Sequence, residues 1–151
     1  MKKKWFMICW VAGVVALASV RMSGAHCQIP CGIYDDAARV ATMLEDAATV
    51  EKAMRQMAEL AKRGDVQSLN QRVRWIVNKE NHAQKIIATI SDYFLTQRVK
   101  ATQADYTERL KRHHAVIVAA MKAKQNSDPM YAKVLMNAIK RIKGYYSGHA
   151  H

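Results

Sequence analysis

Residues 66–94 read VQSLNQRVRWIVNKENHAQKIIATISDYF, and this stretch decides the fold class of the chain. Its apolar side chains recur at steps of three and four residues: Val66, Leu69, Val73, Ile76, Ala83, Ile87, Ile90 and Phe94. Because an α-helix completes a turn every ~3.6 residues, this spacing places them along one face of a long amphipathic helix. No segment alternates apolar and polar residues over a useful length, as a half-buried strand would. The sequence therefore predicts an all-α protein.

Three further segments carry the same helical period, at residues 40–61, 106–120 and 131–142. Gly64-Asp65 separates the first helix from the second, and Asp128-Pro129 has the pattern of a cap followed by proline in the first turn of the last helix. Four amphipathic helices with short connections predict a four-helix bundle over residues 36–146, and residues 147–151 are expected to form a flexible tail.

The first 25 residues have the three parts of a secretory signal peptide. Three lysines precede an almost uncharged apolar run over residues 5–20, and Ser23-Gly24-Ala25 supplies the small residues that signal peptidase reads. The apolar run is shorter than the ~20 residues that usually span a membrane. We expect cleavage between Ala25 and His26, no stable membrane association afterwards, and a secreted or periplasmic protein.

The charge of the chain is strongly basic. It holds 24 Lys and Arg against 12 Asp and Glu; four of the basic residues and none of the acidic ones lie in the leader, so 20 and 12 remain after cleavage. Nucleic acid is a common partner of such a surface, but a secreted address argues against it. A positive surface also raises the encounter rate of a small anionic substrate.

The processed N-terminus would gather metal ligands. His26 would supply an α-amine and an imidazole, and Cys27 and Cys31 would supply two thiolates. An amine, a deprotonated backbone amide and two thiolates can lie in one plane, a geometry typical of Ni(II) or Cu(II), whereas zinc prefers tetrahedral side-chain ligands. A disulfide closing so short a terminal loop would add little stability to a helical core. We expect residues 26–35 to form a metal-binding hook.

The segment His-Cys-x-x-Pro-Cys-Gly-x-Tyr, at residues 26–34, resembles the metal hook of the nickel superoxide dismutase family. Weaker similarities follow along the chain at residues 78–80, 91–94 and 127–129, so that the resemblance covers essentially all of the mature chain. It implies a four-helix bundle that assembles as a homohexamer. It also implies an enzyme that converts superoxide to dioxygen and hydrogen peroxide, with nickel cycling between Ni(II) and Ni(III).

The resemblance also implies roles for individual residues. The metal would be held by the amine and imidazole of His26, by the backbone nitrogen and sulfur of Cys27, and by the sulfur of Cys31. Tyr34 in the hook and a second tyrosine, matched to Tyr93, would guard the substrate pocket. His26, Tyr34 and Tyr93 are thus the expected catalytic residues.

Three departures from the family pattern bear on the metal. The leader resembles an export signal rather than the short pro-segment of better-known members, and Gln28 replaces an aspartate often found after the first cysteine. The glutamate and arginine that orient the axial histidine are also changed: His82 stands where the arginine would be, and Glu45, with Asp46 next, is the expected carboxylate. Because such groups tune a ligand's basicity, copper is an alternative metal.

Two other functions use the same residues. A periplasmic nickel- or copper-binding carrier would hold the metal in this hook without turnover. A thiol–disulfide module is the weaker alternative, because three residues separate Cys27 from Cys31 where the usual redox motif has two.

Overall fold

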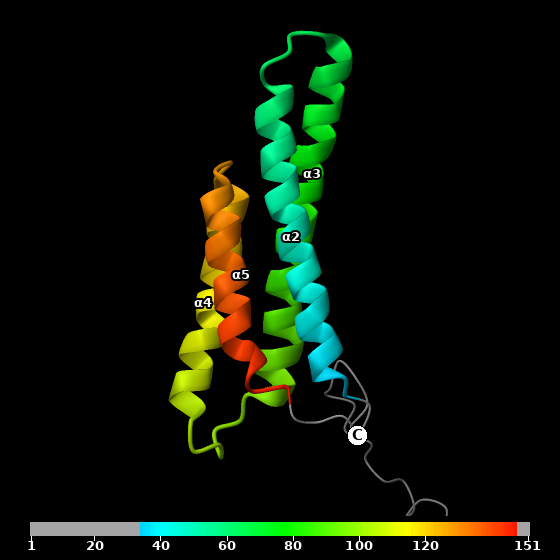
Figure 1. Ribbon diagram of the computed structural model, residues 1–151. Helices are drawn as coiled ribbons and strands as arrows, with labels where there is room; N and C mark the ends of the chain where they lie inside the picture. The colour runs from blue at the N-terminus through cyan, green and yellow to red at the C-terminus, as the bar shows by residue number, and fades with distance from the viewer. Residues whose placement is uncertain (1–33, 148–151) are drawn as a thin grey trace, which may run out of the picture.

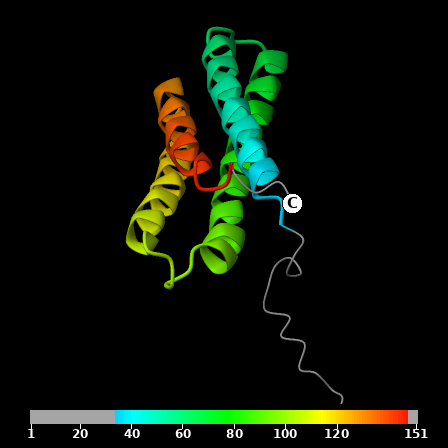
Figure 2. The same ribbon diagram turned by 60° about the horizontal axis from the view of Figure 1, so that its bottom comes forward.

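The computed structural model describes residues 34–147 and folds them into helices, with no strand in this range. In chain order these are α2 (Asp36–Leu60), α3 (Val66–Ala88), the π-helix η1 (Thr89–Arg98), α4 (Tyr106–Gln125) and α5 (Pro129–Lys143). Helices α2 and α3 form one antiparallel hairpin, η1 continues α3, and the shorter α4–α5 hairpin lies beside them (Figures 1 and 2). The predicted four-helix bundle is confirmed.

Helices α2, α3 and α5 begin where the sequence supplies a side chain that accepts one of their first backbone N–H groups. All three begin after an aspartate whose carboxylate does so: Asp35 accepts from Ala38 at 2.9 Å, Asp65 from Ser68 at 2.8 Å and Asp128 from Met130 at 2.8 Å. Aspartate suits this position because the first N–H groups of a helix have no intrahelical partner. Pro129 lies in the first turn of α5, and Gly144 follows its last residue.

The core lies where both hairpins overlap. Its largest fully buried apolar side chains come from every helix: Val40, Met43, Val50, Met54, Ile86, Ile90, Phe94, Val116, Leu135, Ile139 and Ile142. Phe94 of η1 packs edge-on against Tyr93 and contacts the ring of Tyr146 at 4.6 Å between centroids. The aromatic part of the core is therefore at the end of the bundle where η1 stops.

The first half of α3 adds no apolar side chain to the buried core. Its predicted apolar stripe is exposed, with 83% of Val66, 50% of Leu69, 50% of Val73 and 38% of Ile76 accessible. The α2–α3 hairpin extends beyond the tip of the α4–α5 hairpin, so that neither α4 nor α5 covers this part (Figure 1). The helical period was predicted correctly, and the structure adds that the described residues leave the apolar face of this half exposed.

One end of the bundle brings distant parts of the chain together. The start of α2, the end of η1 and the segment after α5 lie there (Figures 1 and 2). Within residues 34–147, no helix is both long and apolar enough to span a bilayer.

Candidate functional site

The predicted metal ligands precede the part of the chain that the structure describes. His26, Cys27 and Cys31 lie outside the described residues, as do the leader at 1–25 and the histidines of the C-terminal tail. The described chain starts at Tyr34, three residues after Cys31. Tyr34 and the first turn of α2 are therefore the described part nearest in sequence to the hook.

The two predicted pocket tyrosines lie next to each other. The ring centroids of Tyr34 and Tyr93 are 6.4 Å apart, with the rings tilted by 54°. Each ring also carries a guanidinium on its face: Arg98 is 4.4 Å from the Tyr34 centroid, and Arg39 is 4.1 Å from that of Tyr93. Cations favour this position because the face of an aromatic ring is electron-rich. Four side chains thus form one cluster beside the start of α2.

The carboxylate of Asp36 joins this cluster. The Tyr93 hydroxyl donates to Asp36 Oδ1 at 2.6 Å, and Arg98 donates from Nε and Nη2 to Asp36 Oδ2 at 2.8 and 2.6 Å. Both Asp36 and Tyr93 are buried, with 6% and 3% of their surfaces exposed. Burial, and then the hydrogen bond and negative charge of Asp36, raise the pKa of Tyr93 to about 12. Tyr93 is therefore a neutral phenol at physiological pH.

Sequence reasoning did not identify Asp36, Arg39 or Arg98. One signal was available: two aspartates stand at the start of α2, where a helix needs a single N-cap. Asp35 takes that role, and its carboxylate accepts the Ala38 N–H at 2.9 Å. The carboxylate of Asp36 is thereby left for a distant partner. Which partner it meets depends on how η1 lies against α2.

The predicted orienting pair is only partly as expected. His82 Nδ1 lies 2.6 Å from Asp46 Oδ1, so its partner is the second carboxylate considered, and Glu45 is exposed on the neighbouring position of α2. Asp46 follows Asp36 by ten residues, which is about 15 Å along a helix that rises ~1.5 Å per residue. The role of His82 or Glu45 toward His26 stays a prediction, because His26 is outside the described residues.

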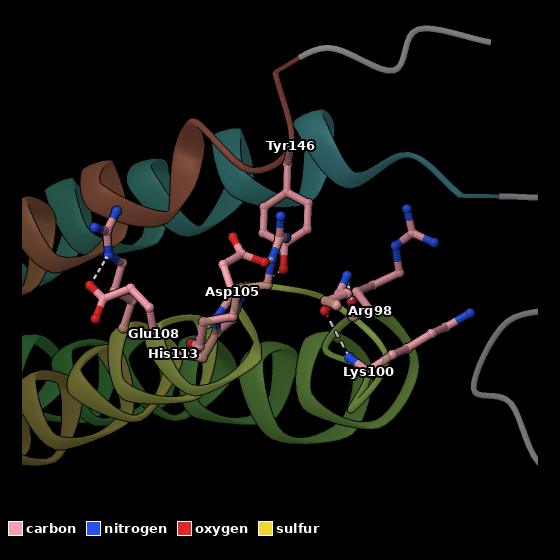
Figure 3. A network of polar contacts seen from close by, with 9 residues as sticks. Arg98, Lys100, Asp105, Glu108, His113 and Tyr146 are labelled. Atoms are coloured by element: carbon pink, nitrogen blue, oxygen red, sulfur yellow. Dashed lines mark hydrogen bonds and ion pairs between the residues drawn. The ribbon is translucent and has the colours of Figure 1, made fainter.

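A second buried polar pair lies on the far side of Phe94. His113 Nε2 is 2.7 Å from the Tyr146 hydroxyl, and His113 Nδ1 is 2.7 Å from the Arg109 carbonyl oxygen. Tyr146 reaches from the segment after α5 toward the side of α4 that carries His113 (Figure 3). Burial lowers the pKa of His113 and raises that of Tyr146. The neighbouring His114 is exposed.

Comparison with known proteins assigns the chain to a family. Residues 21–149 match the family described as nickel-containing superoxide dismutase. The chain belongs to this family. No curated protein and no solved structure shows significant similarity to it. The matched range includes the predicted hook segment, both predicted pocket tyrosines and all of the described helices.

Membership of the nickel-containing superoxide dismutase family assigns the reaction and the metal at that level. The chain is a superoxide dismutase, nickel is its cofactor and superoxide is its substrate. Within residues 34–147 no group of three or more His, Cys, Asp and Glu side chains could hold a metal ion. The donors predicted at residues 26–31 would fit nickel if cleavage frees the amine of His26, because an amine, an amidate and two thiolates are nitrogen and sulfur ligands that Ni(II) accepts.

Proposed function

We propose that the mature chain begins at His26 and dismutates superoxide with nickel bound at that N-terminus. His26 would provide its amine and imidazole, Cys27 its backbone nitrogen and sulfur, and Cys31 its sulfur. The observation that supports this proposal is the sequence His-Cys-x-x-Pro-Cys-Gly-x-Tyr directly after the predicted cleavage site, inside a family match over residues 21–149. When bound, nickel supplies a one-electron couple, and thiolate and amidate donors stabilise its higher oxidation state. The family match favours nickel over copper.

The described residues would serve substrate binding. Two superoxide anions and two protons give one dioxygen and one hydrogen peroxide, so the enzyme must attract an anion and order a small oxygen species. Arg39 and Arg98 bring positive charge to the faces of Tyr93 and Tyr34, beside the segment that leads to the hook. Positive potential at a pocket raises the encounter rate of an anion. Tyr34 and Tyr93 would border the pocket.

Maturation and assembly belong to the same proposal. Signal peptidase would free the amine of His26 on export, and the enzyme would act in the periplasm or outside the cell. A homohexamer would cover the exposed stripe on α3, whose Val66, Leu69, Val73 and Ile76 are spaced by three, four and three residues. This spacing is the one by which helices pair along an apolar seam.

A one-residue insertion tests the hook. A glycine placed between Ala25 and His26 leaves the cleavage signal intact but moves the free amine one residue away from the imidazole and Cys27. We expect exported wild-type protein to start at His26, to bind one nickel per chain and to speed superoxide decay in pulse radiolysis. The insertion variant should lose most of this activity, roughly 100-fold or more, because all ligands must be placed together.

The matched control is the same glycine added after His151, which should leave nickel content and activity unchanged. N-terminal sequencing that starts elsewhere, or an insertion variant with full activity, would contradict the proposed hook. Nickel or copper binding without turnover above that of the free ion would instead identify a carrier.

A further inference from the structure

Asp36 connects to two side chains that lie far from it in the sequence. It is the first residue of α2, and its two partners, Tyr93 and Arg98, lie 57 and 62 residues later in η1. One carboxylate oxygen accepts a hydrogen bond from the tyrosine hydroxyl, and the other accepts hydrogen bonds from two N–H groups of the guanidinium. Burying a carboxylate is costly unless it is paired and hydrogen-bonded, and Arg98 meets both conditions.

The π-helical form of η1 allows Tyr93 and Arg98 to contact Asp36 together. A π-helix forms hydrogen bonds between residues five apart, and the Val99 N–H donates to the Phe94 carbonyl at 2.9 Å. Tyr93 and Arg98 are also five apart, so this winding brings them to one side of η1. In an α-helix, five residues make about 1.4 turns, and the two side chains would diverge. The local winding of η1 therefore serves the contact with Asp36.

The donors and acceptors of this cluster fix the direction of the Tyr93 hydroxyl. An ionised carboxylate can only accept hydrogen bonds, so the single proton of the phenol points at Asp36. The oxygen of Tyr93 keeps lone pairs that can accept. The charged and titratable neighbours of Tyr93 are Asp36 and Arg39 of α2, Arg98 of η1, Tyr34 and, beyond Phe94, Tyr146.

We propose that Asp36 is a positioning residue that holds the proton of Tyr93, so that Tyr93 offers the substrate pocket a hydrogen-bond acceptor rather than a donor. This inference rests on the proposed function, which places Tyr93 at the pocket. An acceptor orders a species that carries a proton, such as water or the hydrogen peroxide product. Superoxide, itself an anion and an acceptor, is met by the guanidinium of Arg39, which has no carboxylate in ion-pair contact within residues 34–147.

The first test uses the metal-free protein. Tyrosines labelled with ¹³C at Cζ are followed by NMR as the pH is raised, and Tyr93→Phe identifies the signal of Tyr93. In wild-type protein the pKa of Tyr93 should be about 12. In Asp36→Asn its pKa should fall toward the ordinary value of 10, because the negative charge is gone while Arg39 and Arg98 remain; burial, the largest cause of the raised pKa, is kept. Glu108→Gln, which breaks an exposed ion pair with Arg112, is the matched control and should change nothing.

The second test uses the nickel-loaded enzyme. A tyrosinate at the pocket would repel superoxide, so the alkaline decline of kcat/KM should begin at lower pH in Asp36→Asn, by the same shift seen in the metal-free protein. Glu108→Gln should keep the wild-type profile. A pKa shift without any movement of the kinetic profile would confine Asp36 to a structural role and overturn the proposal.

These outcomes separate the two proposals. An inactive wild-type enzyme that starts at His26 and contains nickel would refute the proposed function, whereas the titration of Tyr93 would still be measured. If Asp36→Asn does not fold, the titration of the wild-type protein still tests the proposal. A pKa of Tyr93 near 10, as in an exposed tyrosine, would contradict the proposed hydrogen bond from Tyr93 to Asp36.

Discussion

At the scale of single residues, His113 shows how burial and hydrogen bonding select one protonation state. The Arg109 carbonyl can only accept, so Nδ1 of His113 carries a proton, and Nε2 accepts from the Tyr146 hydroxyl. Phe94 and Tyr145 lie against the imidazole, with centroids 5.7 and 6.3 Å away. A proton on Nε2 would remove the acceptor that Tyr146 uses. The fold therefore requires a neutral His113.

This requirement predicts acid sensitivity. Burial lowers the pKa of His113 in the folded state, whereas the unfolded chain binds this proton near the ordinary pKa of 6.5. Below pH 6.5 the unfolded state holds more protons than the folded state. The free energy of unfolding therefore decreases as the pH is lowered, until the pH passes the lowered pKa of His113 in the folded state. His113→Phe should flatten this part of the pH dependence measured by urea denaturation. It should also cost about 1–3 kcal/mol at neutral pH, because the Tyr146 hydroxyl loses its acceptor.

His114→Phe makes the same exchange at the exposed neighbour and serves as control. It should retain the wild-type pH dependence. Identical pH dependence of wild type and His113→Phe would show that His113 carries no proton-linked stability.

At the scale of elements, the end of α4 depends on a lysine from another helix. Lys79 of α3 is buried and donates from Nζ to the carbonyl oxygens of Ala123 and Asn126 at 3.2 and 3.1 Å, and also to that of Lys124. The last carbonyls of a helix have no intrahelical partner, and a cation there also faces the negative end of the helix dipole. Lys79 thus joins α3 to the end of α4.

Lys79→Met should destabilise the protein by about 1–3 kcal/mol, because methionine fills the space of the stem but leaves these carbonyls without a donor. The midpoint of denaturant unfolding measures this loss, and amide exchange should quicken at the end of α4. Lys122→Met, at an exposed position of α4, is the control and should change stability by less than about 0.5 kcal/mol. Equal stability of the two variants would contradict a capping role for Lys79.

At the scale of the whole molecule, the two hairpins differ in length. The α2–α3 hairpin projects past α4 and α5, and no part of the chain between residues 34 and 147 covers its apolar stripe on α3 (Figure 2). A contiguous exposed apolar patch is typical of a surface that meets another protein. The projecting half of α3 is therefore where the proposed homo-oligomer would form contacts.

Val73→Lys tests this contact, because a lysine at the centre of the stripe would have to lose water on assembly. We expect the sedimentation coefficient at micromolar concentration to fall toward that of a smaller species, with the helical circular dichroism retained. Gln67→Lys adds the same charge at an exposed position of α3 that has no stripe residue three or four positions away, and should keep the wild-type value. An unchanged assembly in Val73→Lys would exclude this stripe as the interface.

The sequence by itself determined the helices, the capped starts of α2, α3 and α5, the expected export signal and the ligand-rich segment at His26. These features depend on local physics: apolar periodicity, N-caps, and donors placed next to one another along the chain. The roles of Tyr34 and Tyr93 came instead from the resemblance to a known family.

Only the tertiary structure decided which side chains meet across helices. It paired His82 with Asp46 rather than Glu45, placed Asp36 against Tyr93 and Arg98, and left the first half of α3 uncovered. Neighbouring residues on a helix point in directions about 100° apart, so a small rotation of α2 would exchange one carboxylate for the next. Such rotations, and the π-helical winding of η1, depend on the packing of the whole core. The local pattern of residues therefore does not contain them.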